Sequence, residues 1–170
     1  MVVLQITLLP FQDVGSQVLD HLVQDLEAFG FTTHTAPTVP LPEGAYNPQR
    51  DQYQAEALLA ITHASEGEHL LGITTCDLYV EGLNFVFGLA QRPGKAAVIS
   101  LHRLADNVDT DTYRLRTLKE AVHELGHTFG MAHCKNPNCV MYFSNSLADT
   151  DRKGKNFCGS CRHDLPVGLG

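Results

Sequence analysis

Short apolar segments alternate along the chain with longer segments in which hydrophobic residues recur at helical spacing. The longer segments predict helices over Asp13–Phe29, which Gly30 ends, and over Arg50–Ala64. Apolar runs rich in β-branched residues predict four strands: Val2–Leu9, Phe31–Thr35, His69–Thr74 and Ala96–Leu101. Because a strand, helix, strand order favours parallel pairing through a crossover helix, these elements indicate a mixed α/β fold.

The segment Leu83–Gly88 carries aromatic residues at alternating positions and predicts a partly exposed strand at an edge of the sheet. An exposed edge has unpaired backbone groups, so an extended peptide could add itself there as a further strand. On this interpretation Asn84 and Phe85 are candidate substrate-binding residues. A plain hairpin within the core fits the spacing equally well. The proline-rich segment Ala36–Pro48 predicts a loop.

A third helix is predicted over Asp111–Phe129, with Asp109 among its candidate N-caps. His123 and His127 lie on one side of this helix, near its C-terminal end, and we expect them to face a cleft whose lower wall is formed by the residues that follow. Glu120, one turn before His123, is either a hydrogen-bond acceptor for an imidazole N–H or a surface charge. The opposite side forms a hydrophobic stripe that faces the core: Leu115, Leu118, Val122, Leu125 and Phe129.

The chain has 170 residues, the size of one domain, with 44% hydrophobic and 18% charged residues. A formal charge of -7 argues against binding to nucleic acid or to an anionic membrane, because both require a basic surface. The N-terminal segment lacks the basic start of a signal peptide, and no apolar run reaches the ~18 residues that span a bilayer. These features predict a cytoplasmic protein, with a monomer as the default.

The strongest chemical signal begins at His123 and reads HELGHTFGMAH. On a helix, His123 and His127 lie on one face, close enough to bind one zinc ion. Glu124 is offset by roughly 100°, so its carboxylate can reach a metal-bound water without becoming a ligand. Gly130 can end the helix in a left-handed conformation and return His133 to the same ion. Three imidazoles and a water form an open, catalytic type of zinc site.

Four of the five cysteines lie in the last quarter of the chain: Cys134, Cys139, Cys158 and Cys161. The last two enclose Gly-Ser, the spacing of a zinc knuckle, in which glycine permits a tight turn. Four thiolates at these spacings suit a closed structural zinc site. Two disulfides are the alternative, which a cytosolic location disfavours. Because Cys134 follows His133 directly, a metal held by the cysteines would anchor the third histidine. The charged segment from Asp149 to Lys155 predicts a solvated loop.

These motifs together resemble the archaemetzincins, a branch of the metzincin metallopeptidases. The resemblance rests on HELGHTFGMAH with a cysteine directly behind it, on CVM at 139–141 and on FCGSC at 157–161. It extends upstream through Cys76–Tyr79, Leu83–Ala90 and Val98–Leu101, and so covers roughly the last hundred residues. The placement of the cysteines separates this branch from the other metzincins.

The resemblance implies one metzincin-like domain over residues 1–170, with a mixed twisted sheet, backing helices and the active-site helix before about residue 130. Residues from about 131 to 170 are then a small C-terminal subdomain with a Met-turn and the cysteine zinc site. Met141 falls where the methionine of that turn is expected, as an apolar floor beneath the zinc ligands. Several metzincins stabilise the oxyanion with a tyrosine two residues later. That position is Phe143 here, and Tyr142 is displaced by one residue.

The sequence therefore predicts a zinc metallopeptidase that acts on peptides or proteins and holds two zinc ions per chain, one catalytic and one structural. Glu124 is the expected general base, which takes a proton from the zinc-activated water and passes it to the leaving amine. A zinc-containing peptide-binding or regulatory protein with little turnover is the alternative, because Phe143 replaces the expected tyrosine. A nucleic-acid-binding zinc module is disfavoured by the acidic chain.

Overall fold

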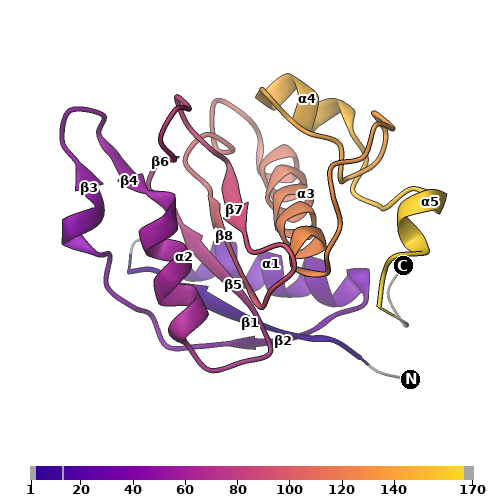
Figure 1. Ribbon diagram of the computed structural model, residues 1–170, viewed down its shortest axis with the longest axis horizontal. Helices are drawn as coiled ribbons and strands as arrows, with labels where there is room; N and C mark the ends of the chain where they lie inside the picture. Colours follow the sequence, from indigo (N-terminus) through magenta and orange to yellow (C-terminus); the bar gives the residue numbers. More distant parts are fainter. Residues whose placement is uncertain (1–2, 13, 167–170) are drawn as a thin grey trace.

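A five-stranded sheet with the strand order β2-β1-β5-β8-β7 runs through the molecule (Figure 1). The computed structural model describes residues 3–12 and 14–166. Four strands are parallel, and the fifth, β7, pairs antiparallel with β8 at one edge. The predicted mixed α/β class and the four predicted strands are confirmed, although Val2 lies outside the described residues. The strands are β1 (Gln5–Pro10), β2 (Thr32–Thr35), β5 (His69–Thr74), β7 (Gly88–Ala90) and β8 (Ala96–Ser100).

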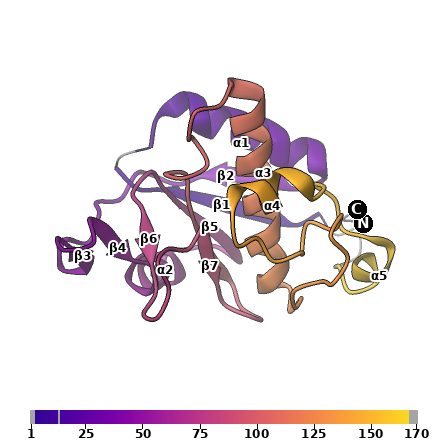
Figure 2. The ribbon, with the colours of Figure 1, turned by 90° about the horizontal axis from the view of Figure 1, so that it is seen from above.

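Helices cover both faces of this sheet. Helices α1 (Ser16–Phe29) and α3 (Thr110–Thr128) pack on one face, and α2 (Ala55–Ala64) packs on the other (Figure 2). Neighbouring residues of β8 therefore enter different cores: Ile99 packs with α1 and α3, and Val98 packs with α2. The first predicted helix is confirmed from Ser16 onward, and Asp13 lies outside the described residues.

The helix predicted from Arg50 begins later, at Ala55. The residues before it form β4 (Gln52–Gln54), the middle strand of a second, three-stranded sheet with β3 (Tyr46–Asn47) and β6 (Leu78–Tyr79). The prediction was wrong here because pairing with β6, more than twenty residues away in the chain, overrides the local preference for helix.

The proline-rich segment contains a 3-10 turn, Glu43–Ala45, and then strand β3. It lies beside α2 at the end of the molecule away from the C-terminal part of α3 (Figure 1). The prediction of a loop is therefore correct for most of its length.

The strand predicted over Leu83–Gly88 is misplaced. Only Gly88 belongs to a strand, because β7 begins there and continues to Ala90. Within the preceding residues Val86 alone forms an isolated bridge, with Leu78. The predicted position at the edge of the sheet is confirmed, since β7 is the last strand in the order. Arg50 holds the irregular segment in place by donating from Nη2 to the carbonyl oxygens of Leu83, at 2.6 Å, and Asn84, at 3.1 Å.

Helix α3 has nearly the predicted limits, but the burial of its residues differs from the prediction. The Asp109 carboxylate caps its N-terminus by accepting from the Thr112 N–H at 2.7 Å, and Gly130 follows its end with a φ of 97°. Leu115, predicted to lie in the core, is 42% exposed. From Arg116 to Gly126 every residue is buried. The hydrophobic stripe faces the sheet, and the C-terminal segment covers the other side of the helix.

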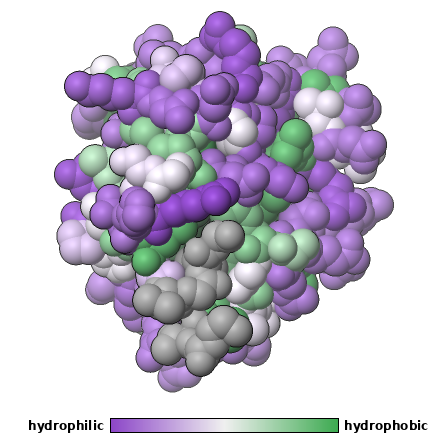
Figure 3. Space-filling view, turned by 90° about the vertical axis from the view of Figure 1, so that its right-hand side faces the viewer, coloured by the Kyte–Doolittle hydropathy of each residue, from purple (hydrophilic) through white to green (hydrophobic). Residues whose placement is uncertain are grey.

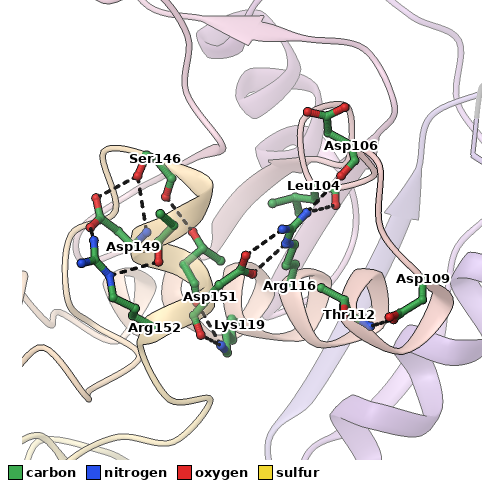
Figure 4. Close-up of polar contacts among 12 residues, drawn as sticks. Leu104, Asp106, Asp109, Thr112, Arg116, Lys119, Ser146, Asp149, Asp151 and Arg152 are labelled. Atoms are coloured by element: carbon green, nitrogen blue, oxygen red, sulfur yellow. Dashed lines mark hydrogen bonds and ion pairs between the residues drawn. The ribbon is translucent and has the colours of Figure 1, made fainter.

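Polar contacts attach this C-terminal segment to α3. Helix α4 (Leu147–Arg152) lies across α3, where the buried Arg116 guanidinium makes two hydrogen bonds of 2.7 Å to the Asp151 carboxylate (Figure 4). The Lys119 ammonium donates to the backbone oxygen of Thr150 at 2.9 Å. The solvated loop predicted from Asp149 to Lys155 is therefore wrong. Its first half is helical, and Lys153 is 2% exposed.

The surface on the side of the C-terminal segment is mainly hydrophilic, with smaller hydrophobic areas between the polar residues (Figure 3). A short helix, α5 (Gly159–Arg162), lies in this region and was not predicted. Within residues 3–12 and 14–166, the helices are too short or too polar to cross a membrane.

Candidate metal centres and active site

Three histidines converge at the C-terminal end of α3. His123 and His127 lie on the helix, and His133 returns to them after the turn at Gly130. One ring nitrogen from each lies within 4.8 Å of the others. The Nε2 atoms of His123 and His127 are 3.2 Å apart. Nitrogen ligands at about 2.0–2.1 Å from a tetrahedral zinc ion are about 3.3 Å from one another, so the spacing fits one shared ion.

The other ring nitrogens of the helical histidines are fixed by backbone carbonyls. His123 Nδ1–H donates to the Val140 oxygen at 2.8 Å, and His127 Nδ1–H donates to the Met131 oxygen at 2.7 Å. These bonds select the tautomer whose Nε2 carries a free lone pair, which is the form that binds a metal. Glu120, predicted as an alternative acceptor for an imidazole, does not have this role.

Burial favours the neutral form of these imidazoles. It lowers the pKa of His123 well below its ordinary value, and the nearby Lys153 ammonium lowers it further. Burial likewise lowers the pKa of His127 and of His133. A neutral imidazole is the form that binds a metal, because one ring nitrogen then has a free lone pair to donate to a cation.

A cavity of about 630 Å³ opens beside the histidines. The predicted substrate-binding residues Asn84 and Phe85 line one wall, and Phe143 lines another. Glu124 also lines the cavity and is 6% exposed. Among the residues that the structure describes, none from 36 to 48 contributes to the walls, so the proline-rich segment does not cover this cavity.

The Glu124 side chain lies directly against the backbone of Gly88, the first residue of β7. A Cβ atom at Gly88 would lie 2.8 Å from Glu124 Cγ, 2.9 Å from its Oε1 and 2.7 Å from the Val98 carbonyl oxygen. These separations are too short for real carbon contacts, and one of the three neighbours is rigid backbone. Because Gly88 has no side chain, the Glu124 side chain has room to lie at the cavity wall.

Replacing Gly88 with alanine is expected to displace the Glu124 carboxylate and to lower kcat by about 10²-fold, the order of loss caused by a 1 Å misplacement. Zinc content should stay unchanged, because the three atoms nearest to a Cβ at Gly88 belong to Val98 and Glu124 and not to a histidine. Gly82→Ala provides a control glycine with open space around its Cβ position, although its φ of 86° adds local strain. Wild-type kcat in Gly88→Ala, measured with a zinc assay, would contradict the prediction.

Met141 lies beneath α3. A Cβ atom at Gly126 would collide with Met141 Sδ, so the methionine touches the helix backbone between the two helical histidines. Met141 is completely buried, whereas Phe143 is 49% exposed and its ring centroid lies 5.0 Å from that of His133. These positions agree with an apolar floor at Met141 and with an aromatic side chain at Phe143 that has no hydroxyl to donate.

The four C-terminal cysteines form a second group. Their sulfur atoms lie within 4.8 Å of one another, and the Cys134 and Cys158 sulfurs are 3.8 Å apart. Thiolates at about 2.3 Å from a tetrahedral zinc ion are about 3.8 Å from each other, so this set fits a closed zinc site. The Asn136 N–H donates to the Cys134 sulfur at 3.4 Å, and the Cys158 N–H donates to the Cys139 sulfur at 3.3 Å. A hydrogen bond from the Cys161 backbone lowers the pKa of Cys158 to about 7, whereas burial raises the pKa of Cys139 and that of Cys161.

The two groups are connected through the backbone. Cys134 N–H donates to the Met141 carbonyl oxygen at 2.9 Å, and Cys134 pairs with Tyr142 as an isolated bridge. His133 is therefore joined directly to a residue that belongs to the cysteine group and is bonded to the methionine turn.

Lys153 is one of the site residues that the sequence analysis missed. Its ammonium lies 3.4 Å from His123 Nδ1 and donates to the Tyr142 carbonyl oxygen at 2.9 Å. Glu120 was expected near an imidazole or at the surface, but it is 3% exposed and lines the same cavity as Glu124. A charged residue between two cysteine pairs carries no local signal of burial, so only the packing of α4 on α3 shows where Lys153 lies.

Comparison with known proteins places these observations in a family. The chain matches the model of peptidase family M54 over residues 1–166. It is 54% identical over 131 residues to the archaemetzincin of Methanopyrus kandleri, which covers 76% of this chain and 74% of that protein. It is 40% identical over 180 residues to the archaemetzincin of Pyrococcus furiosus, covering 97% of this chain and 94% of that protein.

Solved structures agree with this result. The crystal structure of the Archaeoglobus fulgidus archaemetzincin complexed with malonate matches with a TM-score of 0.88 and 39% identity, over 95% of this chain and 100% of that one. The Methanopyrus kandleri archaemetzincin structure matches with a TM-score of 0.85 and 41% identity, over 95% of this chain and 92% of that one. The chain therefore belongs to peptidase family M54, the family of the archaemetzincins, and is a zinc metallopeptidase.

Proposed function

We propose that the chain hydrolyses peptide bonds in the cavity beside α3, with one zinc ion held by His123, His127 and His133 and with Glu124 as general base. The observation that carries this proposal is the convergence of three imidazoles at a cavity wall that also contains the Glu124 carboxyl group. Three nitrogen ligands leave an open coordination position, which distinguishes a catalytic zinc site from a structural one.

A zinc ion held by His123, His127 and His133 would supply an activated water molecule and would polarise the peptide carbonyl. Glu124 would accept the proton of the water that attacks the carbonyl carbon. Glu124 then gives the proton to the leaving nitrogen, so that the amine departs uncharged and the carboxylate is regenerated. Phe85 and Phe143 supply apolar cavity walls for the side chains of the substrate.

A second zinc ion held by Cys134, Cys139, Cys158 and Cys161 has a structural role in this proposal. Four sulfur ligands leave no open position for water, so this site has no hydrolytic chemistry of its own. It ties the ends of the C-terminal segment together and so fixes the direction from which His133 approaches the catalytic site.

Phe143 favours a second candidate function, a zinc-containing protein that binds peptides or regulates a partner with little turnover. The phenyl ring occupies a cavity wall but cannot donate a hydrogen bond to an oxyanion. Slow hydrolysis by this site would follow from such a loss, whereas zinc and peptide binding would persist.

Zinc removal tests the proposed function. The purified protein is expected to hold two zinc ions per chain, one for each group of potential ligands, and to lose peptide cleavage on chelation and regain it with added zinc. His133→Gln should keep the cysteine-bound ion and lose cleavage, while His163→Gln, a change at another exposed histidine of the C-terminal segment, should change neither. Zinc-independent cleavage, or one ion per chain with full activity, would overturn the proposal. Peptide binding without cleavage by the zinc-loaded protein would support the second candidate.

A further inference from the structure

A second cavity, of about 640 Å³, adjoins the one beside the histidines. Phe85, Phe87 and Asn145 line both cavities, so the two meet at these side chains. The other walls of the second cavity come from the segment that follows β8 and from the segment that leads into α4. The proposed function uses only the first cavity, and a volume of this size is enough for a further part of a bound ligand.

The Phe85 ring at this boundary is held by a cation and by a second aromatic ring. The Arg103 guanidinium carbon lies 3.9 Å from the centroid of the Phe85 ring, over its face. The Phe87 ring meets it edge to face, with the centroids 5.1 Å apart. Phe87 is 7% exposed and belongs to the hydrophobic core. A cation over an aromatic face and an edge-to-face pair are both attractive, so these contacts fix the position of the ring.

Asp77 in turn fixes the Arg103 guanidinium. Arg103 Nε donates to Asp77 Oδ1 at 3.0 Å, and Nη2 donates to Oδ2 at 2.9 Å. The Asp77 side chain is 9% exposed, whereas that of Arg103 is 39% exposed at the wall of the second cavity. Two parallel hydrogen bonds set the plane of a guanidinium group as well as its position. The face that Arg103 presents to Phe85 is therefore determined by a buried carboxylate.

The same carboxylate is linked to the backbone of the cavity wall. Gln52, which is 5% exposed, donates from Nε2 both to Asp77 Oδ2 and to the Asn84 carbonyl oxygen, each at 2.9 Å. Arg50 Nε donates to Gln52 Oε1 at 2.7 Å. The wall at Asn84 belongs to no strand, so these side chains supply hydrogen bonds that a partner strand would otherwise give. Asp77 thus connects the backbone at Asn84 with the ring at Phe85.

We propose that the second cavity continues the substrate-binding groove and takes an apolar side chain of the same peptide, and that Asp77 and Arg103 are positioning residues that set this specificity through Phe85. Phe85, Phe87 and Leu147 supply the apolar part of its walls. The Arg103 charge is paired with Asp77 and lies against the Phe85 ring, which leaves it less suited to binding an acidic side chain. This inference rests on the proposed function, because it assumes that a peptide binds in the first cavity.

A peptide that fills both cavities must extend well beyond the bond that is cleaved. The groove therefore favours extended peptides or protein segments over dipeptides. An apolar side chain bound away from the zinc site contributes to the binding of substrate and transition state alike, so its loss raises KM and leaves kcat nearly unchanged. A difference of one methylene group in a hydrophobic pocket changes kcat/KM by about 10- to 200-fold, so the effect is measurable.

Peptides of different length test the second cavity. A peptide that the wild type cleaves, selected from a mixed-peptide library, is shortened one residue at a time from each end. KM is expected to rise by at least about tenfold, with kcat within about twofold, at a step that removes a residue not adjacent to the cleaved bond. Restoring an apolar residue at that position should restore KM, whereas aspartate should not. A KM that does not change with length at either end overturns the proposal.

Arg103→Met tests the positioning role. For the unshortened peptide KM should rise about tenfold, and for the shortened peptide it should stay within about twofold of wild type, with kcat and zinc content unchanged. Phe85→Ala should also raise KM for the unshortened peptide. Adding Arg103→Met to it should raise KM no further, because residues that act through one another are not additive. Arg114→Met is the matched control, since Arg114 makes the same pair of hydrogen bonds to Asp25 and neither residue lines these cavities.

Arg103→Met leaves the buried Asp77 carboxylate without its cation, so a double variant that combines it with Asp77→Asn and removes both charges is measured beside it. It should show the same dependence of KM on peptide length and the zinc content of the wild type. Wild-type KM in both variants, an equal rise of KM for every peptide length, or additive effects of Phe85→Ala and Arg103→Met would overturn the proposal. If the zinc-loaded wild type cleaves no peptide, the proposed function fails instead, and dissociation constants of library peptides over the same series of lengths still decide whether the second cavity binds them.

Discussion

Replacing Glu124 with glutamine is expected to lower kcat by about 10²- to 10⁴-fold, the range that general acid–base catalysis contributes. The amide is nearly the same size as the carboxyl group, so it fits between Gly88 and Glu120, but it cannot accept the proton of the attacking water. The expected result is a folded, zinc-loaded protein that binds peptide and does not cleave it. Activity on a mixed-peptide library, together with zinc content, measures both quantities.

The control for this variant is Glu81→Gln, the same chemical change at an exposed position in the loop that leads to the cavity wall. It should have wild-type activity. Equal and near-zero cleavage by wild type and Glu124→Gln would favour the binding or regulatory function suggested by Phe143. Equal and substantial cleavage by both would show that another group accepts the proton.

The residues around Glu124 shift its pKa and so affect whether its carboxyl group is ionised. Burial raises the pKa of Glu124 well above its ordinary value, and the adjacent Glu120 raises it further, whereas Lys153 acts in the opposite direction. A general base must be ionised to act. The Lys153 charge, which lowers the pKa of Glu124, therefore favours the ionised form that the proposed mechanism requires.

The two groups of candidate metal ligands could be predicted because their signal is local. The spacing of His123 and His127 fixes them on one face of a helix, and Gly130 marks the turn that returns His133 to them. The cysteine group follows from spacing in the same way. In each case a few neighbouring residues determine the geometry, and the structure brings the predicted side chains together.

Other parts of the site depend on contacts between distant segments, and local patterns could not show them. Gly88 matters because β7 passes directly over Glu124, and Lys153 is buried because Arg116 and Lys119 hold the helix before it. Leu115 was expected in the core because the helical stripe includes it, but its side chain is 42% exposed. The error at Leu83–Gly88 has the same origin, since alternation of aromatic residues does not establish that a partner strand is present.

Replacing Cys161 with serine is expected to cause the largest loss of stability. Cys161 lies on α5 at the far end of the segment that begins at Cys134, and loss of one thiolate ligand should release the structural zinc. Structural zinc binding contributes about 10–16 kcal/mol in zinc-finger peptides, in which the metal holds most of the fold. The sheet and α3 have their own core here, so only part of that energy is at stake. A loss of about 4 kcal/mol would lower Tm by about 8–16 °C in a chain of this length.

The same variant is expected to weaken zinc binding at the histidines, although Cys161 lies far from them in the chain. Cys134 directly follows His133 and bonds to the Met141 carbonyl oxygen, so a disordered cysteine group leaves His133 without a fixed direction of approach. Zinc content should therefore fall from two ions to fewer than one per chain at limiting zinc, with loss of cleavage. Cys76→Ser, a change outside the group, should retain both ions. Full cleavage by Cys161→Ser with one firmly bound zinc ion would show that the two sites are independent. If a reductant destabilises the wild type and a chelator does not, the cysteines form disulfides and do not bind a second zinc ion.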